Sequence, residues 1–145
     1  MRIDGCFSYH SPTYNKSCHS LIKHYEIINQ SSIVLGILES IANIREFTRG
    51  LTCSEFTADK KTNLAVIRCL EVIGEATKKI PADLRSQQPS LPWAEISGIR
   101  DKLIHDYFGV DLEIVWTTVE NDLGLLEQSV VEILRKINRP LGGHP

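Results

Sequence analysis

Apolar residues recur at every third or fourth position along most of this chain, which is the spacing of one face of an α-helix. The first clear stripe predicts a helix that starts near residue 33, and Gly50 is a suitable residue for its C-terminal stop. No stretch shows the strict alternation of a half-buried strand, so helices are expected throughout. The stripe consists of Val34, Ile37, Leu38, Ile41 and Ile44.

A second helix is predicted from Asp59 to Lys79, after a loop that contains Cys53 and Ser54, and Pro81 ends it. Gly74 lies in its middle, where glycine costs about 1 kcal/mol relative to alanine, so we expect a neighbouring helix to approach closely there. A short helical turn is expected within 82–88. The apolar stripe of the second helix consists of Val66, Leu70, Ile73, Ala76 and Ile80.

Pro92 suits the first turn of a third helix, and Gly109 marks its end. Asp111 is a favourable N-cap for a last long helix, whose apolar residues alternate at spacings of four and three. We therefore predict an all-α, up-and-down four-helix bundle with a possible extra short helix. The inward-facing residues are Trp93, Ile96, Ile99 and Leu103 in the third helix, and Leu112, Trp116, Val119, Leu123, Leu126, Val130, Ile133 and Ile137 in the last.

The periodicity divides the chain into three parts. Residues 1–30 lack a clean period and are expected to be an extension that is partly disordered or loosely docked, with a short helical lead-in at Leu21, Ile22, Tyr25 and Ile28. Residues 31–138 form the helical domain, and 139–145 form a C-terminal tail. A single domain fits a length of 145 residues.

Composition narrows the expected partners. The formal net charge of −2 means that contact with nucleic acid requires a local basic site rather than a basic surface over the whole protein. No uninterrupted apolar run approaches the ~18 residues of a membrane span, and the N-terminus lacks the apolar core of a signal peptide. We expect a cytoplasmic protein that binds no membrane.

The four cysteines predict neither a disulfide framework nor a metal site. Cys6, Cys18, Cys53 and Cys69 are scattered, and Cys69 lies among apolar neighbours in a helical pattern, which favours reduced, partly buried thiols. A set drawn from Cys6, His10, Cys18 and His19 fits no standard zinc spacing. No metal and no cofactor are expected.

Candidate chemistry is concentrated between residues 99 and 109. Arg100, Asp101, His105 and Tyr107 place a fixed positive charge, a carboxylate, an imidazole and a phenol within eight residues. Arginine suits phosphate, and histidine exchanges protons near neutral pH, so the set indicates phosphodiester chemistry. On a helix Asp101 and His105 share a face, whereas Arg100 and His105 diverge. The set therefore makes either a loose site that a second copy would complete, or an ordinary surface pair of Asp101 with His105.

The spacing Arg100-Asp101-x(3)-His105-x-Tyr107 resembles the motif of HEPN domains, and in particular the branch of HepT-like toxins. Three further segments resemble that branch in the same order, and the likeness covers roughly residues 31–138. They are Ile67–Ala76 (IRCLEVIGEA), Pro92–Asp101 (PWAEISGIRD) and Tyr107–Trp116 (YFGVDLEIVW).

The resemblance implies a metal-independent endoribonuclease toxin that uses the 2′-hydroxyl of RNA as the nucleophile. His105 would be the base or acid, Arg100 would clamp the non-bridging phosphate oxygens, and Asp101 would orient one of them. Many HEPN domains carry Asn at the position of Asp101. The resemblance also implies a homodimer with its motifs at the interface, in a type VII-like toxin–antitoxin pair. A minimal nucleotidyltransferase antitoxin would attach AMP to Tyr107, giving O-AMP-tyrosine.

Two other classes of function remain open from the residues alone. The domain is alternatively a non-catalytic nucleotide- or partner-binding helical module that works with a nucleotidyltransferase. It is otherwise a purely structural interaction protein.

Overall fold

The computed structural model of the protein describes residues 12–105 and 109–139, with side chains described for 18–103 and 109–139. The ordered elements in these ranges are all helices, which confirms the all-α prediction. They are α1 (Pro12–Thr48), α2 (Cys53–Ala58), α3 (Lys60–Lys78), α4 (Ala82–Arg85), α5 (Trp93–His105), α6 (Leu112–Asn121) and α7 (Leu123–Ile137).

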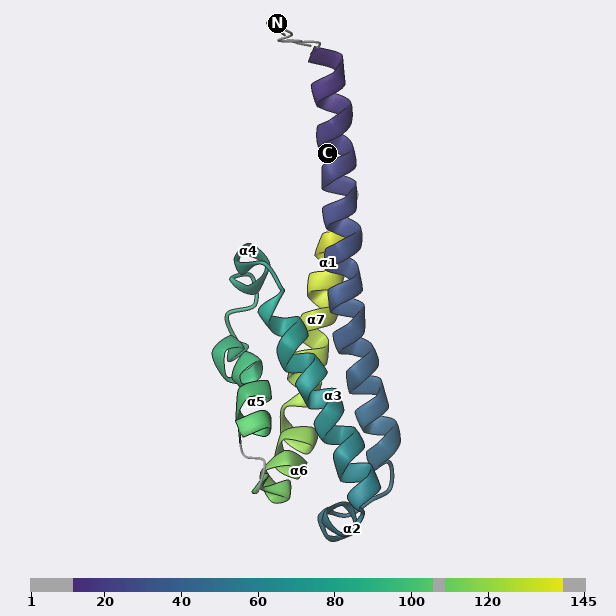
Figure 1. Ribbon diagram of the computed structural model, residues 1–145, viewed down its shortest axis with the longest axis vertical. Coiled ribbons are helices and arrows are strands. Elements are labelled where there is room, and N and C mark those ends of the chain that lie inside the picture. The colour runs from purple at the N-terminus through teal and green to yellow at the C-terminus, as the bar shows by residue number, and fades with distance from the viewer. Residues whose placement is uncertain (1–11, 106–108, 140–145) are drawn as a thin grey trace, which may run out of the picture.

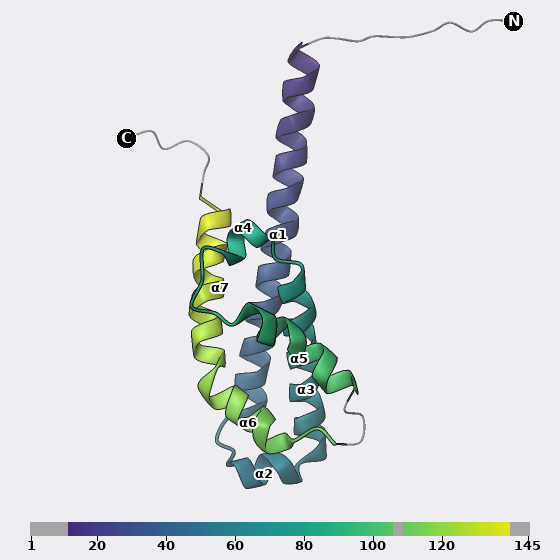
Figure 2. The ribbon, with the colours of Figure 1, turned by 90° about the vertical axis from the view of Figure 1, so that its left-hand side faces the viewer.

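The long helix α1 is the centre of the bundle. Helices α3 and α7 pack along it, and α5 packs on α3 (Figure 1). Helix α2 contacts α3 and α6 at the end of the bundle opposite the N-terminus, as the turned view shows (Figure 2). The four main helices are therefore α1, α3, α5 and the α6–α7 pair, as the apolar stripes predict.

The core consists of the residues that the stripes placed inward. Ile37, Ile41, Val66 and Ile133 are completely buried, and burying each such side chain is worth about 1.5–3 kcal/mol. The last seam is buried from Leu123 onward, while its first part is half-buried except for a buried Trp116. The short helical turn expected within 82–88 is α4.

The segment around Cys53 was predicted to be a loop, and that prediction is wrong. Thr52 and Glu55 form a capping box: the Thr52 side chain accepts a hydrogen bond from the Glu55 backbone, and the Glu55 carboxylate accepts one from the Thr52 backbone. The resulting helix α2 buries Phe56 completely against Trp116, with ring centroids 5.3 Å apart. A bonded cap and a buried aromatic ring thus stabilise a helix of only six residues.

The last helix is divided in two, which corrects the single long helix predicted from Asp111 onward. Asp111 does cap α6, by accepting hydrogen bonds from the backbones of Glu113 and Ile114. The helix is interrupted at Asp122, and α6 then lies at an angle across the base of the bundle before α7 rises along α1 (Figure 2). Asn121, Asp122 and Gly124 are all weak helix formers, so the interruption costs little here.

The first part of α1 extends well past the end of α7 (Figure 1). The helical lead-in expected at Leu21–Ile28 is present as part of this continuous helix. Side chains 18–26 are all exposed, and the Ser31 hydroxyl bonds to Asn138, the residue after α7, near the point where α1 enters the bundle.

The segment Cys18–Thr48 of α1 has the length and mean hydropathy, 1.3 over an 18-residue window, of a helix that can cross a membrane. The apolar residues of its second half, Val34, Ile37, Ile41 and Ile44, are buried in the bundle core. A core helix of a soluble protein meets the same two criteria, so the composition of α1 by itself assigns no membrane span.

Candidate functional site

Helix α5 is held against α3 at Gly74, where the prediction of a close helix approach is confirmed. A Cβ atom at this glycine would lie 3.1 Å from both the Cβ and the backbone nitrogen of Arg100, and 3.4 Å from the carbonyl oxygen of Ile96. Only a residue without a side chain allows this contact. The glycine therefore fixes the height at which Arg100 leaves α5.

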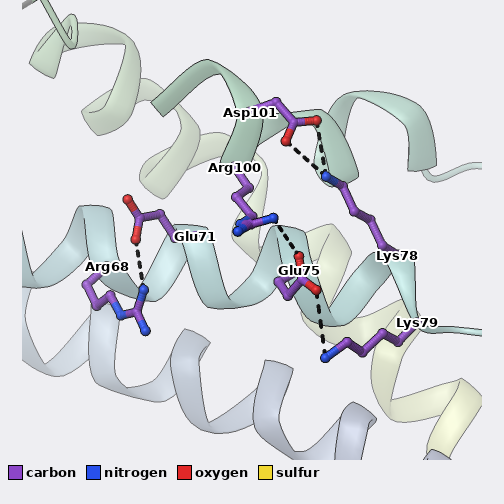
Figure 3. Close-up of polar contacts among 7 residues, drawn as sticks. All are labelled: Arg68, Glu71, Glu75, Lys78, Lys79, Arg100 and Asp101. Atoms are coloured by element: carbon purple, nitrogen blue, oxygen red, sulfur yellow. Dashed lines mark hydrogen bonds and ion pairs between the residues drawn. The ribbon is translucent and has the colours of Figure 1, made fainter. Parts of the chain in front are cut away.

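The guanidinium of Arg100 points from α5 toward α3 and meets a carboxylate there (Figure 3). Its Nη1 atom lies 3.0 Å from Oε2 of Glu75, and the other oxygen of Glu75 lies 3.7 Å from Nζ of Lys79. The Arg100 side chain remains 41% exposed, so its other N–H donors can reach a ligand. Glu75 thus orients an accessible arginine without burying it.

A second ion pair joins the two helices beside the first. Nζ of Lys78 lies 3.0 and 3.1 Å from the two carboxylate oxygens of Asp101 (Figure 3). Both side chains are substantially exposed, so the pair contributes at most about 1 kcal/mol to stability. The role predicted for Asp101, orienting Arg100 or His105, stays a prediction, and the carboxylate that bonds to Arg100 is that of Glu75.

Arg100 lines a groove of about 430 Å³ between α1, α3 and α5. Arg68 and Lys79 bring two further cations to this groove, and Glu71 accepts a 3.0 Å hydrogen bond from Arg68. The groove is thus a local basic site balanced by carboxylates, which fits a protein with a net charge of −2. The remaining lining residues are Ser32, Ile33, Gly36, Val72, Glu75 and Ala76.

His105 is the last residue of α5, five positions after Arg100. Its backbone is described and its side chain is not, so its distance from Arg100 remains undefined. Tyr107 lies outside the described residues. Among the predicted site residues, the structure therefore defines the side chains of Arg100 and Asp101, and both contact α3.

The charged residues of α3 were not predicted as part of the site. They follow each other at spacings of three and four along one face of the helix, opposite the apolar stripe. Such a row is ordinarily a solvated surface, and only the position of α5 makes it part of a groove. The row consists of Arg68, Glu71, Glu75, Lys78 and Lys79.

The described residues contain no cluster of three or more His, Cys, Asp or Glu side chains that could hold a metal ion. Cys18, Cys53 and Cys69 are free thiols. Partial burial raises the pKa of the Cys69 thiol, and the nearby charge of Arg68 lowers it only in part. A thiol with a raised pKa is a poor nucleophile at neutral pH, so Cys69 is assigned no chemical role.

Comparisons with known proteins place this site in a family. A family model described as "Ribonuclease HepT-like" matches residues 37–133, which include Gly74, Glu75, Arg100 and His105. The chain is also 51% identical over 100 residues to "Probable ribonuclease HepT" of Thermococcus cleftensis, a match that covers 69% of this chain and 90% of the relative.

Two further relatives agree with this assignment. "Putative RNase MJ1216" of Methanocaldococcus jannaschii is 46% identical over 106 residues, covering 73% of this chain and 88% of the relative. "Putative RNase TTE0752" of Caldanaerobacter subterraneus is 42% identical over 100 residues, covering 69% and 89%. No solved structure matches the chain. A family match over most of the helical bundle, together with the Arg100 groove on it, shows that the chain belongs to the HepT-like ribonuclease family.

Proposed function

We propose that this protein is a metal-independent endoribonuclease that cleaves RNA by attack of its 2′-hydroxyl on the adjacent phosphate. Arg100 binds the non-bridging oxygens and stabilises the charge that develops on phosphorus. His105 exchanges the protons of the nucleophile and the leaving group. The activity is that of a cytoplasmic toxin that works as a homodimer.

The observation that supports this proposal best is the state of Arg100. Its guanidinium is oriented by Glu75 at 3.0 Å, is still 41% exposed, and lies in a groove with two more cations. A purely structural arginine would be expected to have its donors satisfied within the protein. An oriented and accessible arginine on the same helix as His105 instead suits the recognition of a phosphate.

Control of the toxin is the second part of the proposal. A minimal nucleotidyltransferase antitoxin transfers AMP to the Tyr107 phenol, two residues after the end of α5. The added phosphodiester carries a negative charge, which competes for Arg100 and repels an incoming RNA phosphate. The bulk of the nucleoside obstructs access to the groove as well.

Cleavage of RNA in the presence of EDTA tests the catalytic part. We expect wild-type activity to survive chelation, and Arg100→Ala and His105→Ala each to lower the rate by about 10²–10⁴-fold. Circular dichroism and melting temperature should remain close to wild type. Arg135→Ala is the matched control, because this arginine is exposed and lies on α7. EDTA-sensitive cleavage, or an active His105→Ala protein, would contradict the proposal.

Co-expression with the nucleotidyltransferase tests the control of the toxin. Intact-mass spectrometry should show the addition of AMP, and peptide mapping should place it on Tyr107. A Tyr107→Phe protein should remain unmodified and toxic. AMP on a different residue would exclude Tyr107 as the control point. If wild-type RNA cleavage is absent while a nucleotidyltransferase still binds, the chain is the non-catalytic module instead.

A further inference from the structure

The part of α1 that leaves the bundle carries large apolar side chains into solvent. Leu21 is 66% exposed and Tyr25 is 75% exposed, with Ile22 and Ile28 more than half exposed. An isolated helix of this length is marginally stable in water, and its stability in proteins comes mainly from packing of an apolar face. We call residues 18–35 of α1 the arm.

The exposed residues of the arm form a seam rather than scattered contacts. Leu21, Tyr25, Ile28, Ser32 and Leu35 follow each other at spacings of four, three, four and three, which is the pattern of a helix that pairs with another helix. The seam lies on the side of α1 away from the core residues of the same helix. It stops at Glu39, the next position in the series. Its length is about 21 Å at 1.5 Å per residue.

The seam continues into the candidate site. Ser32 belongs to the seam and also lines the groove that contains Arg100. The face that lacks a partner along the arm is therefore adjacent to the face that carries the catalytic motif. The divergence of Arg100 and His105 on one helix already predicts that a second copy completes the site, and this position of the seam indicates where that copy docks.

The chemistry of the arm favours a second copy over a lipid surface. Helices that lie on membranes are rich in lysine and arginine on their polar face. Residues 18–30 contain one lysine and one glutamate, Lys23 and Glu26, and so carry no net formal charge with histidine neutral. The seam itself is self-complementary, because an isologous contact places the same apolar positions on both sides.

We propose that the arm pairs antiparallel with the arm of a second copy of this chain, about a two-fold axis that passes near Ile28. The tip of each arm, around Leu21, then lies against the Ser32–Leu35 region of the other, beside its Arg100 groove. The inference deepens the proposed function, since it names the contact that holds the proposed homodimer. It also makes the arm of one copy an edge of the groove of the other.

Sedimentation equilibrium of full-length variants tests the contact. The wild type should be dimeric at micromolar concentration, and Leu21→Glu/Tyr25→Glu should associate at least 100-fold more weakly. Ser20→Glu/Lys23→Glu is the matched control, with the same two substitutions at exposed arm positions away from the seam, and it should associate like the wild type. Circular dichroism should report an intact bundle in each variant, because the substituted side chains contact no core residue.

Chemical cross-linking supplies an independent readout. In a background with Cys6→Ser and Cys18→Ser, a short bis-maleimide should join two Ile28→Cys chains, while Lys23→Cys chains should cross-link no more than the parent. Wild-type monomers, or a seam variant that associates as tightly as the wild type, would overturn the arm contact. Co-sedimentation of the wild type but not the seam variant with phosphatidylcholine–phosphatidylglycerol vesicles would overturn it too, in favour of lipid. Loss of the ribonuclease proposal would appear separately, as wild-type protein that pairs but does not cleave RNA.

Discussion

The two sides of helix α5 differ in chemistry and in how closely they are packed. Toward α3, Arg100 and Asp101 meet charged partners, and the backbones approach so closely that only Gly74 fits. Toward α6 and α7 the same helix presents apolar residues to open grooves of about 430 and 220 Å³. The apolar residues that line one or both grooves are Leu70, Ile73, Leu91, Ile96, Ile99, Leu103, Ile114, Leu123, Leu125 and Leu126.

This difference shows which contact sets the geometry of the site. Close-packed surfaces transmit a change of one methylene, whereas an open groove absorbs it. The position of Arg100 therefore depends on the α3 side, and the opposite side of α5 contributes mainly to stability. Substitutions on the two sides should separate cleavage from folding.

Gly74→Val should have the largest effect, because it damages both properties. Its Cβ would lie 3.1 Å from Arg100 backbone and side-chain atoms, and relief requires α5 to move away from α3. We expect a loss of about 1–3 kcal/mol in the free energy of unfolding and about 100-fold in cleavage rate. Gly98→Val on α5 is the control, since a side chain there meets nothing within 4 Å. Equal behaviour of the two variants in urea unfolding and RNA cleavage would contradict the role of the close contact.

Ile96→Ala tests the apolar side. This side chain is buried and lines the larger groove, so its truncation should cost about 2 kcal/mol, near the lower end for such changes because part of the cavity already exists. Cleavage per folded molecule should stay within a few-fold of wild type, since the Gly74 contact is intact. Ile114→Ala, at an exposed position of the same groove, should change stability by less than about 0.5 kcal/mol. A large loss of activity at full folding would show that the open side also positions Arg100.

The same contrast explains how much was predictable from the sequence. The stripes through Ile41, Ile73 and Ile133 report burial directly, because an apolar face at a helical period has to be covered, and all three are core residues. Gly74 was also interpretable, since mid-helix glycine is costly unless a backbone approaches. The partner of Arg100 was not, because Glu75 lies 25 positions away and its local spacing is that of any solvated helix face.

The two errors in the helix boundaries have different causes. Helix α2 has a sequence signal, the capping box of Thr52 and Glu55, and a buried Phe56 that needed a neighbour. The interruption at Asp122 leaves the apolar spacing unchanged, because Leu123 and Leu126 stay buried on both counts. Periodicity alone therefore cannot reveal it.

Glu75→Gln should sharpen the comparison on the polar side. It removes the charge that orients Arg100 at 3.0 Å while preserving the shape of the side chain. We expect kcat to fall about tenfold, with KM less affected and stability changed by less than about 1 kcal/mol because the pair is exposed. Glu71→Gln is the control in the same groove, since Glu71 bonds to Arg68 instead. Faster cleavage by Glu75→Gln would mean that the carboxylate competes with RNA for Arg100 rather than orienting it.

The smallest effect is expected at the ion pair of Lys78 and Asp101, which also joins α3 to α5. A double-mutant cycle with Lys78→Met and Asp101→Asn should give a coupling energy of about 0.2–1 kcal/mol in urea unfolding, because both side chains are exposed. The coupling should nearly vanish in 1 M NaCl, where the Debye length is about 3 Å. Asp101→Asn keeps a polar side chain of the same shape, so its effect on cleavage, compared with Lys78→Met, separates the contact with Lys78 from any other role of the carboxylate. If Asp101 only joins the helices, the two variants should cleave RNA equally. A lower rate for Asp101→Asn alone would place this carboxylate in the chemistry.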